Sequence, residues 1–131
     1  MERSGLGDRC TLVRGDVFEH RLDAAAYDCA LVGFLISHLT DSEEARLFAA
    51  LKTVLTASGR FLILESAWSP ARAEVHIKAG RQERRLNDGS AFDIYKRYFD
   101  RADVTEWARR YAVSLDVEHF GTAFLAVSGR F

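Results

Sequence analysis

The chain has 131 residues, of which 48% are hydrophobic and 28% charged, a composition typical of one globular domain with a sizeable core. Eighteen Lys and Arg against nineteen Asp and Glu give a net charge of −1, which disfavours nucleic-acid or membrane binding through basic residues. No apolar run reaches the roughly 18 residues of a spanning helix, and residues 1–9 lack the apolar stretch of a signal peptide. We therefore expect a soluble, cytoplasmic protein.

Two apolar runs near the start of the chain predict strands. The first covers residues 10–13, and the second covers residues 29–36. The second run is almost continuously apolar, which is typical of a central strand in a parallel sheet. Cys10 and Cys29 lie in these runs, and we expect buried, reduced thiols there rather than a disulfide framework or a metal site.

A helix is predicted after the second strand. Thr40 and Glu43 have the spacing of a capping box, and apolar residues at helical spacing follow over residues 47–55. Gly59 is expected just past the end of this helix, where glycine takes a left-handed conformation at low cost. Residues 61–64 form another apolar run, so that the segment predicts a strand–helix–strand unit with parallel strands.

The middle of the chain predicts a β-hairpin. The sequence Asn-Asp-Gly-Ser at residues 87–90 is a strong turn signal between residues 84–86 and residues 92–95. Residues 69–80 mix Ala, Arg and Glu, and their pattern leaves helix and strand open.

The last third of the chain predicts a helix and two strands. Asp100 is placed to cap a helix whose apolar face ends near Tyr111. Residues 113–117 alternate between apolar and polar, and residues 123–127 are fully apolar. We expect these two strands to form an antiparallel hairpin at the end of an otherwise parallel α/β sheet.

The order of these segments resembles a known family. Three of them, 15–18, 27–39 and 51–65, resemble class I methyltransferases that use S-adenosylmethionine. Residues 84–96 resemble a subgroup of small-molecule O-methyltransferases. The resemblance extends over about residues 8–128. It implies an α/β fold with a partial Rossmann-like sheet, mostly parallel with an antiparallel C-terminal hairpin, and transfer of a methyl group from S-adenosylmethionine to an oxygen of a small acidic molecule.

The sequence departs from this family at its start. The family opens with a strand, a glycine-rich loop and a helix, and then a second strand that ends in an acidic residue. Gly5-Leu6-Gly7 does not replace the loop, because a ligand-binding glycine loop needs a strand before it and a helix after it. We therefore expect one truncated domain over residues 1–131, with the first two strands of the family missing. Whether this chain alone is an active enzyme stays open.

A sheet without those strands would leave an apolar edge bare, and bare edges pair with other chains. The sequence therefore predicts a homodimer or a swapped oligomer, with weak or no activity for the chain alone. The alternative is a non-catalytic remnant of the fold that associates with itself or with a partner.

The resemblance also implies residues for the cofactor. The carboxylate of Asp16 would accept from the adenine amino group, and the neighbouring amide of Val17 would contact a ring nitrogen. Gly33 and Phe34 would line the site of methyl transfer. Two alternatives stay open: Asp16 forms an ordinary turn by bonding to its own backbone, and Phe34 packs in the core.

Acceptor and catalytic residues follow from the same resemblance. Arg84 and Lys96 match positions that hold an anionic acceptor such as a carboxylate or phosphonate, in a stretch, residues 72–101, with eight basic and five acidic residues. The alternative is a solvated hairpin with alternating charges. His38 is the candidate base on an acceptor hydroxyl; alternatively it holds its loop by hydrogen bonds. No metal site is expected.

Overall fold

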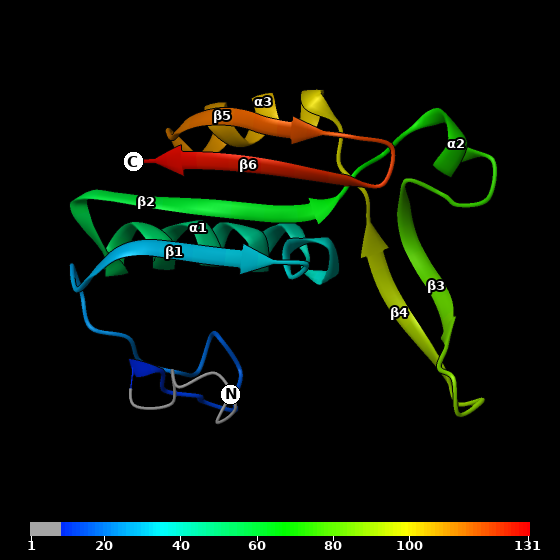
Figure 1. Cartoon of the computed structure of the whole chain (residues 1–131), viewed down its shortest axis with the longest axis horizontal. Coiled ribbons are helices and arrows are strands. Elements are labelled where there is room, and N and C mark those ends of the chain that lie inside the picture. The colour runs from blue at the N-terminus through cyan, green and yellow to red at the C-terminus, as the bar shows by residue number, and fades with distance from the viewer. Residues whose placement is uncertain (1–8) are drawn as a thin grey trace.

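Six strands, three α helices and one short 3-10 helix follow one another in the part of the chain that the computed structural model describes, residues 9–131 (Figure 1). In chain order they are β1 (Tyr27–Gly33), η3 (Ile36–His38), α1 (Asp41–Val54), β2 (Leu55–Ser66), α2 (Pro70–Ala73), β3 (Ala79–Arg85), β4 (Ala91–Arg97), α3 (Arg101–Tyr111), β5 (Ser114–Phe120) and β6 (Phe124–Arg130).

Four of the strands form the main sheet, in the order β1-β2-β6-β5. β1 and β2 are parallel and are joined through α1, which confirms the predicted strand–helix–strand unit. β6 lies antiparallel to both β2 and β5, so that the predicted C-terminal hairpin is also confirmed. The expectation of a mostly parallel sheet is wrong for the described residues: the sheet is mixed, because β6 lies between β2 and β5 and reverses the strand direction.

The capping box of α1 forms as predicted. The Oγ1 atom of Thr40 accepts from the Glu43 amide at 3.4 Å, and the Thr40 amide donates to Glu43 Oε2 at 2.8 Å. The expected role of Gly59 is wrong, because α1 ends at Val54 and Leu55 already has extended backbone angles. The chain passes straight into β2 without a left-handed residue, and Gly59 lies within that strand.

The core lies on one face of the main sheet, under α1 and α3. Figure 1 shows both helices behind the strands, and the ring of Phe48 in α1 stacks on Tyr111 of α3 at 4.1 Å between centroids. Alternate residues of β2 and β6, among them Ile63 and Val127, are fully buried on this face. The opposite face has no helix over it in residues 9–131, and Leu31 of β1 remains 65% exposed there.

Three expectations for the first third of the chain are corrected. Residues 10–13 form no strand, because no described strand lies beside the outer edge of β1 to pair with them. Cys10 and Cys29 are exposed free thiols rather than buried ones, since Cys10 lies in that unpaired segment and Cys29 in an edge strand. The strand expected over residues 29–36 is shifted to Tyr27–Gly33, because Phe34 turns the chain with a φ of +53°.

The predicted hairpin in the middle of the chain is confirmed. β3 and β4 pair antiparallel over their whole length and form a separate two-stranded sheet. The hairpin extends beyond the ends of β1 and β2 at which both arrows point (Figure 1). The segment left open, residues 69–80, begins as the short helix α2 and enters β3 at its end.

The predicted cap of α3 is confirmed as well. Asp100 Oδ1 accepts from the amides of Ala102 and Asp103 at 2.9 and 3.1 Å. Its other oxygen accepts from Lys78 Nζ at 2.7 Å. Burial opposes the ionisation of Asp100, but these hydrogen bonds outweigh it and hold the pKa of the carboxyl below its ordinary value. The ionised cap therefore ties the start of α3 to the segment before β3.

Candidate functional site

The chain turns sharply where β1 ends. Phe34 has a φ of +53°, which is uncommon for a residue with a side chain, and its amide donates to the Leu64 carbonyl at 2.8 Å. The ring of Phe34 is 47% exposed and meets the edge of Phe124 at 5.7 Å between centroids. The turn therefore presents an aromatic ring at the carboxyl ends of the two parallel strands, where ligands of open α/β sheets bind.

Asp16 forms the turn that the sequence left open as an alternative. Its Oδ1 atom accepts from the Phe18 amide at 2.8 Å, and its carbonyl accepts from the amides of Glu19 and His20 at 3.1 Å each. The side chain is exposed, and no hydrogen bond to Oδ2 comes from the described residues. The turn thus leaves one carboxylate oxygen open to a ligand.

An apolar groove of about 530 Å³ runs along the outer edge of β1, between that strand, α1 and residues 17–22. Val17 and Gly33 both line it, and Asp16 and Val17 line two adjoining hollows of about 220 and 360 Å³. Three of the four residues expected at the cofactor therefore lie around one groove. Phe34 follows Gly33 directly in the chain but does not line the groove.

The groove fits the adenosine end of S-adenosylmethionine better than the methionine end. The groove is lined mostly by apolar side chains, and a carboxylate with an open oxygen lies in the adjoining hollows; such a combination suits an adenine ring and its amino group. The methionine end needs a glycine-rich loop between a strand and a helix. The glycines of residues 9–131 stand singly along the chain, so the described part supplies no such loop.

A row of contacts joins η3 to β4. Arg97 Nη2 donates to the Ile36 carbonyl at 3.2 Å, and Lys96 Nζ donates to Ser37 Oγ at 2.7 Å. His38 Nδ1 lies 2.9 Å from the carbonyl of Tyr95. Three consecutive residues of η3 thus contact three consecutive residues of β4. The contact of His38 agrees with the loop-holding alternative, although the side chain is exposed.

The strand register brings Arg84 and Lys96 to one face of the hairpin. Lys96 lies opposite Gly80 and Arg84 lies opposite Phe92, so that Gln82, between the positions of Gly80 and Arg84, shares this face. Lys96 is only 5% exposed, whereas Arg84 is exposed. On the other face, Arg81 and Arg85 pair with carboxylates of the hairpin itself, Asp93 and Glu83 respectively.

The surroundings of Lys96 hold more positive than negative charge. Burial lowers the pKa of the Lys96 ammonium group, the carboxylate of Glu65 opposes this, and the guanidinium groups of Arg84 and Arg72 lower the pKa further. Two buried nitrogen atoms nearby, Arg72 Nε and Gln82 Nε2, have no hydrogen-bond partner among the described residues. The arrangement has unused donors and excess positive charge, which is what an anion would complement.

Sequence reasoning missed two buried carboxylates. Glu65 is fully buried at the carboxyl end of β2, and Glu44 is 1% exposed on α1. Glu44 accepts from Arg97 Nη2 at 2.7 Å and from the Tyr111 hydroxyl at 2.6 Å. The signal for Glu65 was a charged residue at the end of the apolar run 61–64; Glu44 had no signal beyond its place one turn before Phe48.

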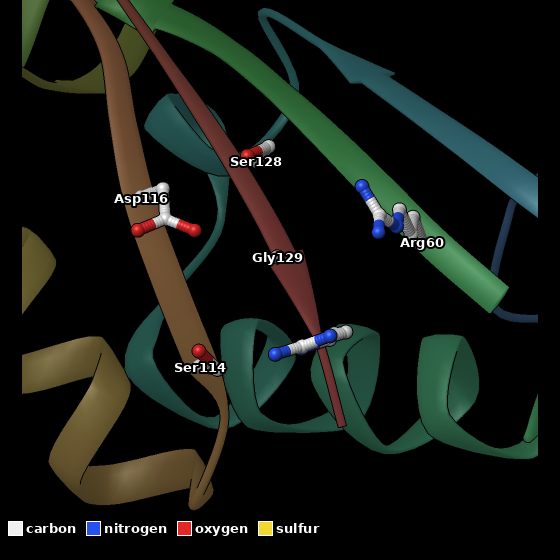
Figure 2. Close-up of a pocket in the computed structure, with 6 residues that line it drawn as sticks. Arg60, Ser114, Asp116, Ser128 and Gly129 are labelled. Carbon is white, nitrogen blue, oxygen red and sulfur yellow. The ribbon is translucent and has the colours of Figure 1, made fainter. Parts of the chain in front are cut away.

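A separate small hollow of about 170 Å³ lies on the sheet face that the helices leave uncovered (Figure 2). It is nearer the amino-terminal half of β2, away from the strand ends where the candidate site lies. Figure 2 shows Arg60 of β2 and Asp116 of β5 on either side of Ser128. None of the residues expected to bind cofactor or acceptor lines it.

Two further observations concern other kinds of site. No helix in residues 9–131 is long and apolar enough to cross a membrane. The same part of the chain contains no group of three His, Cys, Asp or Glu side chains arranged to hold a metal ion.

No protein-family model and no curated protein matches the chain, whereas solved structures do. The complex of DhpI with SAM and HEP superposes with a TM-score of 0.77 at 22% identity, covering 98% of this chain and 61% of DhpI. The glycopeptide N-methyltransferase MtfA superposes with a TM-score of 0.69 at 17% identity. The match covers 97% of this chain and 63% of MtfA. The 1,6-didemethyltoxoflavin-N1-methyltransferase from Burkholderia thailandensis superposes with a TM-score of 0.66 at 17% identity. The match covers 95% of this chain and 52% of that enzyme.

The chain thus spans between about half and three fifths of the length of these three structures. Their match extends over nearly all of this chain, including the main sheet and the β3–β4 hairpin. The α/β fold that the sequence resemblance implied is confirmed in its class: residues of this chain superpose on part of the fold of S-adenosylmethionine-dependent methyltransferases.

Proposed function

We propose that this chain is the acceptor-binding part of a methyltransferase that moves a methyl group from S-adenosylmethionine to an oxygen of a small acidic molecule. The observation that carries the proposal is the excess of positive charge around Lys96, where Arg72 and Arg84 stand against one carboxylate, Glu65. This cluster adjoins the carboxyl ends of the parallel strands through the contact of Lys96 with Ser37.

The acceptor is held by its acidic group. Lys96 and Arg84 attract the anion from one face of the hairpin, and the unpartnered nitrogen atoms of Arg72 and Gln82 are further donors for it. Among the structures with this fold, MtfA and the Burkholderia enzyme are named for transfer to nitrogen. The fold alone therefore does not choose between oxygen and nitrogen. The cationic surroundings favour an acceptor that carries an acidic group, and the choice of oxygen rests on the sequence resemblance.

His38 is the proposed base on the acceptor hydroxyl. The Tyr95 carbonyl can only accept, so the Nδ1 atom of His38 carries the ring proton in their contact. The other ring nitrogen, Nε2, then has the lone pair that can take a proton. The exposed side chain leaves this atom open to a ligand.

The proposed cofactor site consists of four residues. Val17 and Gly33 line the groove, Asp16 lines the adjoining hollow, and Phe34 follows Gly33 at the end of β1. S-adenosylmethionine, when bound, supplies the methyl group. Because the described residues lack a glycine-rich loop, we expect this chain alone to bind the cofactor weakly and to turn over slowly or not at all.

Calorimetric titration of the chain with S-adenosylhomocysteine tests the cofactor site. We expect weak binding that is still detectable at millimolar ligand, and its loss in Asp16→Ala, because the open carboxylate oxygen is the hydrogen-bond acceptor for the adenine amino group. Asp23→Ala is the matched control, since Asp23 is exposed in the same segment but does not line the groove or its adjoining hollows. No heat at millimolar ligand, or equal binding by both variants, contradicts the cofactor assignment.

The open edge of β1 favours a second candidate, a non-catalytic chain that associates with itself as a homodimer or swapped oligomer. Among residues 9–131, β1 is an edge strand of the sheet, and Leu31 and the apolar groove lie exposed along it. We expect light scattering to show a dimer at micromolar concentration and Leu31→Lys to shift it toward monomer. A wild-type chain that stays monomeric at the same concentrations contradicts this candidate.

A further inference from the structure

Glu65 occupies a fully buried position in the core, where an apolar residue would pack equally well. It pairs with Leu125 in the main sheet and is fully buried beside Ile63 and Val127, which are apolar. Both of its carboxylate oxygens accept backbone hydrogen bonds, Oε1 from the Ser37 amide at 3.0 Å and Oε2 from the Ser66 amide at 3.2 Å. Burying a carboxyl group in a core is costly, so its presence there calls for a role beyond packing.

Ser37 connects this carboxylate to the hairpin. Its amide donates to Glu65, and its hydroxyl oxygen accepts from Lys96 Nζ at 2.7 Å. Ser37 is itself fully buried. A protonated lysine has three N–H donors, and the hydroxyl of Ser37 takes one of them. The contact fixes the ammonium group at the end of the parallel strands while leaving donors for a ligand.

Charged groups face Lys96 from three of the elements packed against it, whereas η3 contributes the uncharged hydroxyl of Ser37. Glu65 acts from β2, Arg84 from β3 and Arg72 from α2; on β4 itself the ring of Tyr98 lies 5.5 Å from Nζ. Glu65 is the only one of these charged groups that favours the protonated form of Lys96, since both guanidinium groups and burial disfavour it.

We propose that Glu65 and Ser37 are positioning residues for Lys96: together they hold its ammonium group at the strand ends, as the group that receives the anion of the acceptor. The inference rests on the proposed function for the identity of the ligand, and on the geometry of the three residues for the role of Glu65.

The consequence is a dependence of anion binding on pH. A lysine whose charged form is stabilised by Glu65 binds an anion up to the pH at which it loses its proton. Without the carboxylate, two guanidinium groups and burial remain, and Lys96 becomes neutral at a lower pH. Anion affinity is then lost in a pH range in which the wild-type chain still binds.

The chain contains three lysines, Lys52, Lys78 and Lys96, so that each can be followed separately by NMR in protein labelled with ¹³C at Cε of lysine. Lys96→Met assigns the third signal. We expect Glu65→Gln to lower the midpoint of the Lys96 titration by about one pH unit or more. Glu65→Asp should recover part of the shift, because it restores the charge.

Ser37→Ala keeps the carboxylate and removes the acceptor of the Lys96 hydrogen bond, so it tests the same link should Glu65→Gln fail to fold. It is expected to lower the Lys96 midpoint as well. Lys52 and Lys78 are internal controls, and Glu83→Gln is the matched variant, since Glu83 is an exposed carboxylate on the other face of the hairpin. Unchanged Lys96 midpoints in both Glu65→Gln and Ser37→Ala overturn the inference.

Methylphosphonate, followed by the same Lys96 signal, separates this inference from the proposed function. A response of the wild-type signal that weakens in Glu65→Gln at alkaline pH supports both. If the Lys96 signal responds to methylphosphonate but its titration midpoint is unchanged in the variants, the role of Glu65 is overturned and the proposed acceptor site is kept. If the Lys96 titration midpoint shifts in the variants but the Lys96 signal responds neither to methylphosphonate nor to acetate, the proposed acceptor is contradicted. Only the link between Glu65 and Lys96 is then kept.

Discussion

Replacing Glu44 with glutamine is expected to lower the free energy of unfolding by about 3–5 kcal/mol, the usual cost of removing one partner from a buried ion pair. The side chains of Arg97 and Glu44 are 12% and 2% exposed, and Arg97 Nη2 lies 2.7 Å from Glu44 Oε2. Burial and the hydrogen bond to Glu44 raise the pKa of Tyr111 to about 12, so that its hydroxyl stays a donor. The variant leaves the guanidinium buried without its main counter-charge.

Asp41→Asn is the matched control for this variant. Asp41 also contacts Arg97, at 3.0 Å from Nη1, but its side chain is 78% exposed. An exposed ion pair contributes at most about 1 kcal/mol, so the control should lose little. Urea unfolding followed by circular dichroism measures both. Equal losses in the two variants would show that burial of Glu44 is not what makes its pair with Arg97 important.

Phe48→Ala is expected to cost about 3–5 kcal/mol, by loss of buried area and by the cavity that remains. Phe48 is 1% exposed and its ring contacts three others, stacking on Tyr111 and lying about 6 Å from the rings of Phe61 and Trp107. It therefore joins α1, the sheet and α3 at one point. Loss of this ring leaves a space that three fixed elements cannot close.

Phe92→Ala removes the same side chain from an exposed position and serves as the control. Phe92 lies on the hairpin and is 52% exposed, so its replacement should change the free energy of unfolding by less than about 1 kcal/mol. Thermal unfolding of both variants gives the comparison. A Phe48→Ala variant as stable as Phe92→Ala is incompatible with a core centred on α1 and α3.

The sequence predicted correctly those features that depend on residues close together in the chain. The capping box at Thr40, the turn at residues 87–90 and the cap at Asp100 each depend on residues a few positions apart, and all three form. The strand expected over residues 10–13 depended on a neighbour that the described chain does not contain, and it does not form. Apolar character alone made Cys10 and Cys29 look buried, whereas exposure is decided by which strands lie beside them.

The candidate site divides in the same way. Arg84 and Lys96 could be assigned to one face of the hairpin from the turn and the alternation of strand residues, once the register was known. The contact of Lys96 with Ser37 joins residues 59 positions apart and has no signature in the sequence. The burial of Glu65 was equally hidden, because a charged residue after an apolar run is more often at a surface than inside.

The separateness of the β3–β4 hairpin has a consequence for how this part of the chain can vary. Its backbone pairing is entirely between nearby residues, in a sheet of its own. A lone two-stranded hairpin is only marginally stable in water, so its order depends on the contacts of β4 with η3. The tip beyond Arg84 and Phe92 lies outside those contacts. Insertions and substitutions there can therefore occur without disturbing the folding of the core. Under the proposed function, the tip is where an altered range of acceptors would arise.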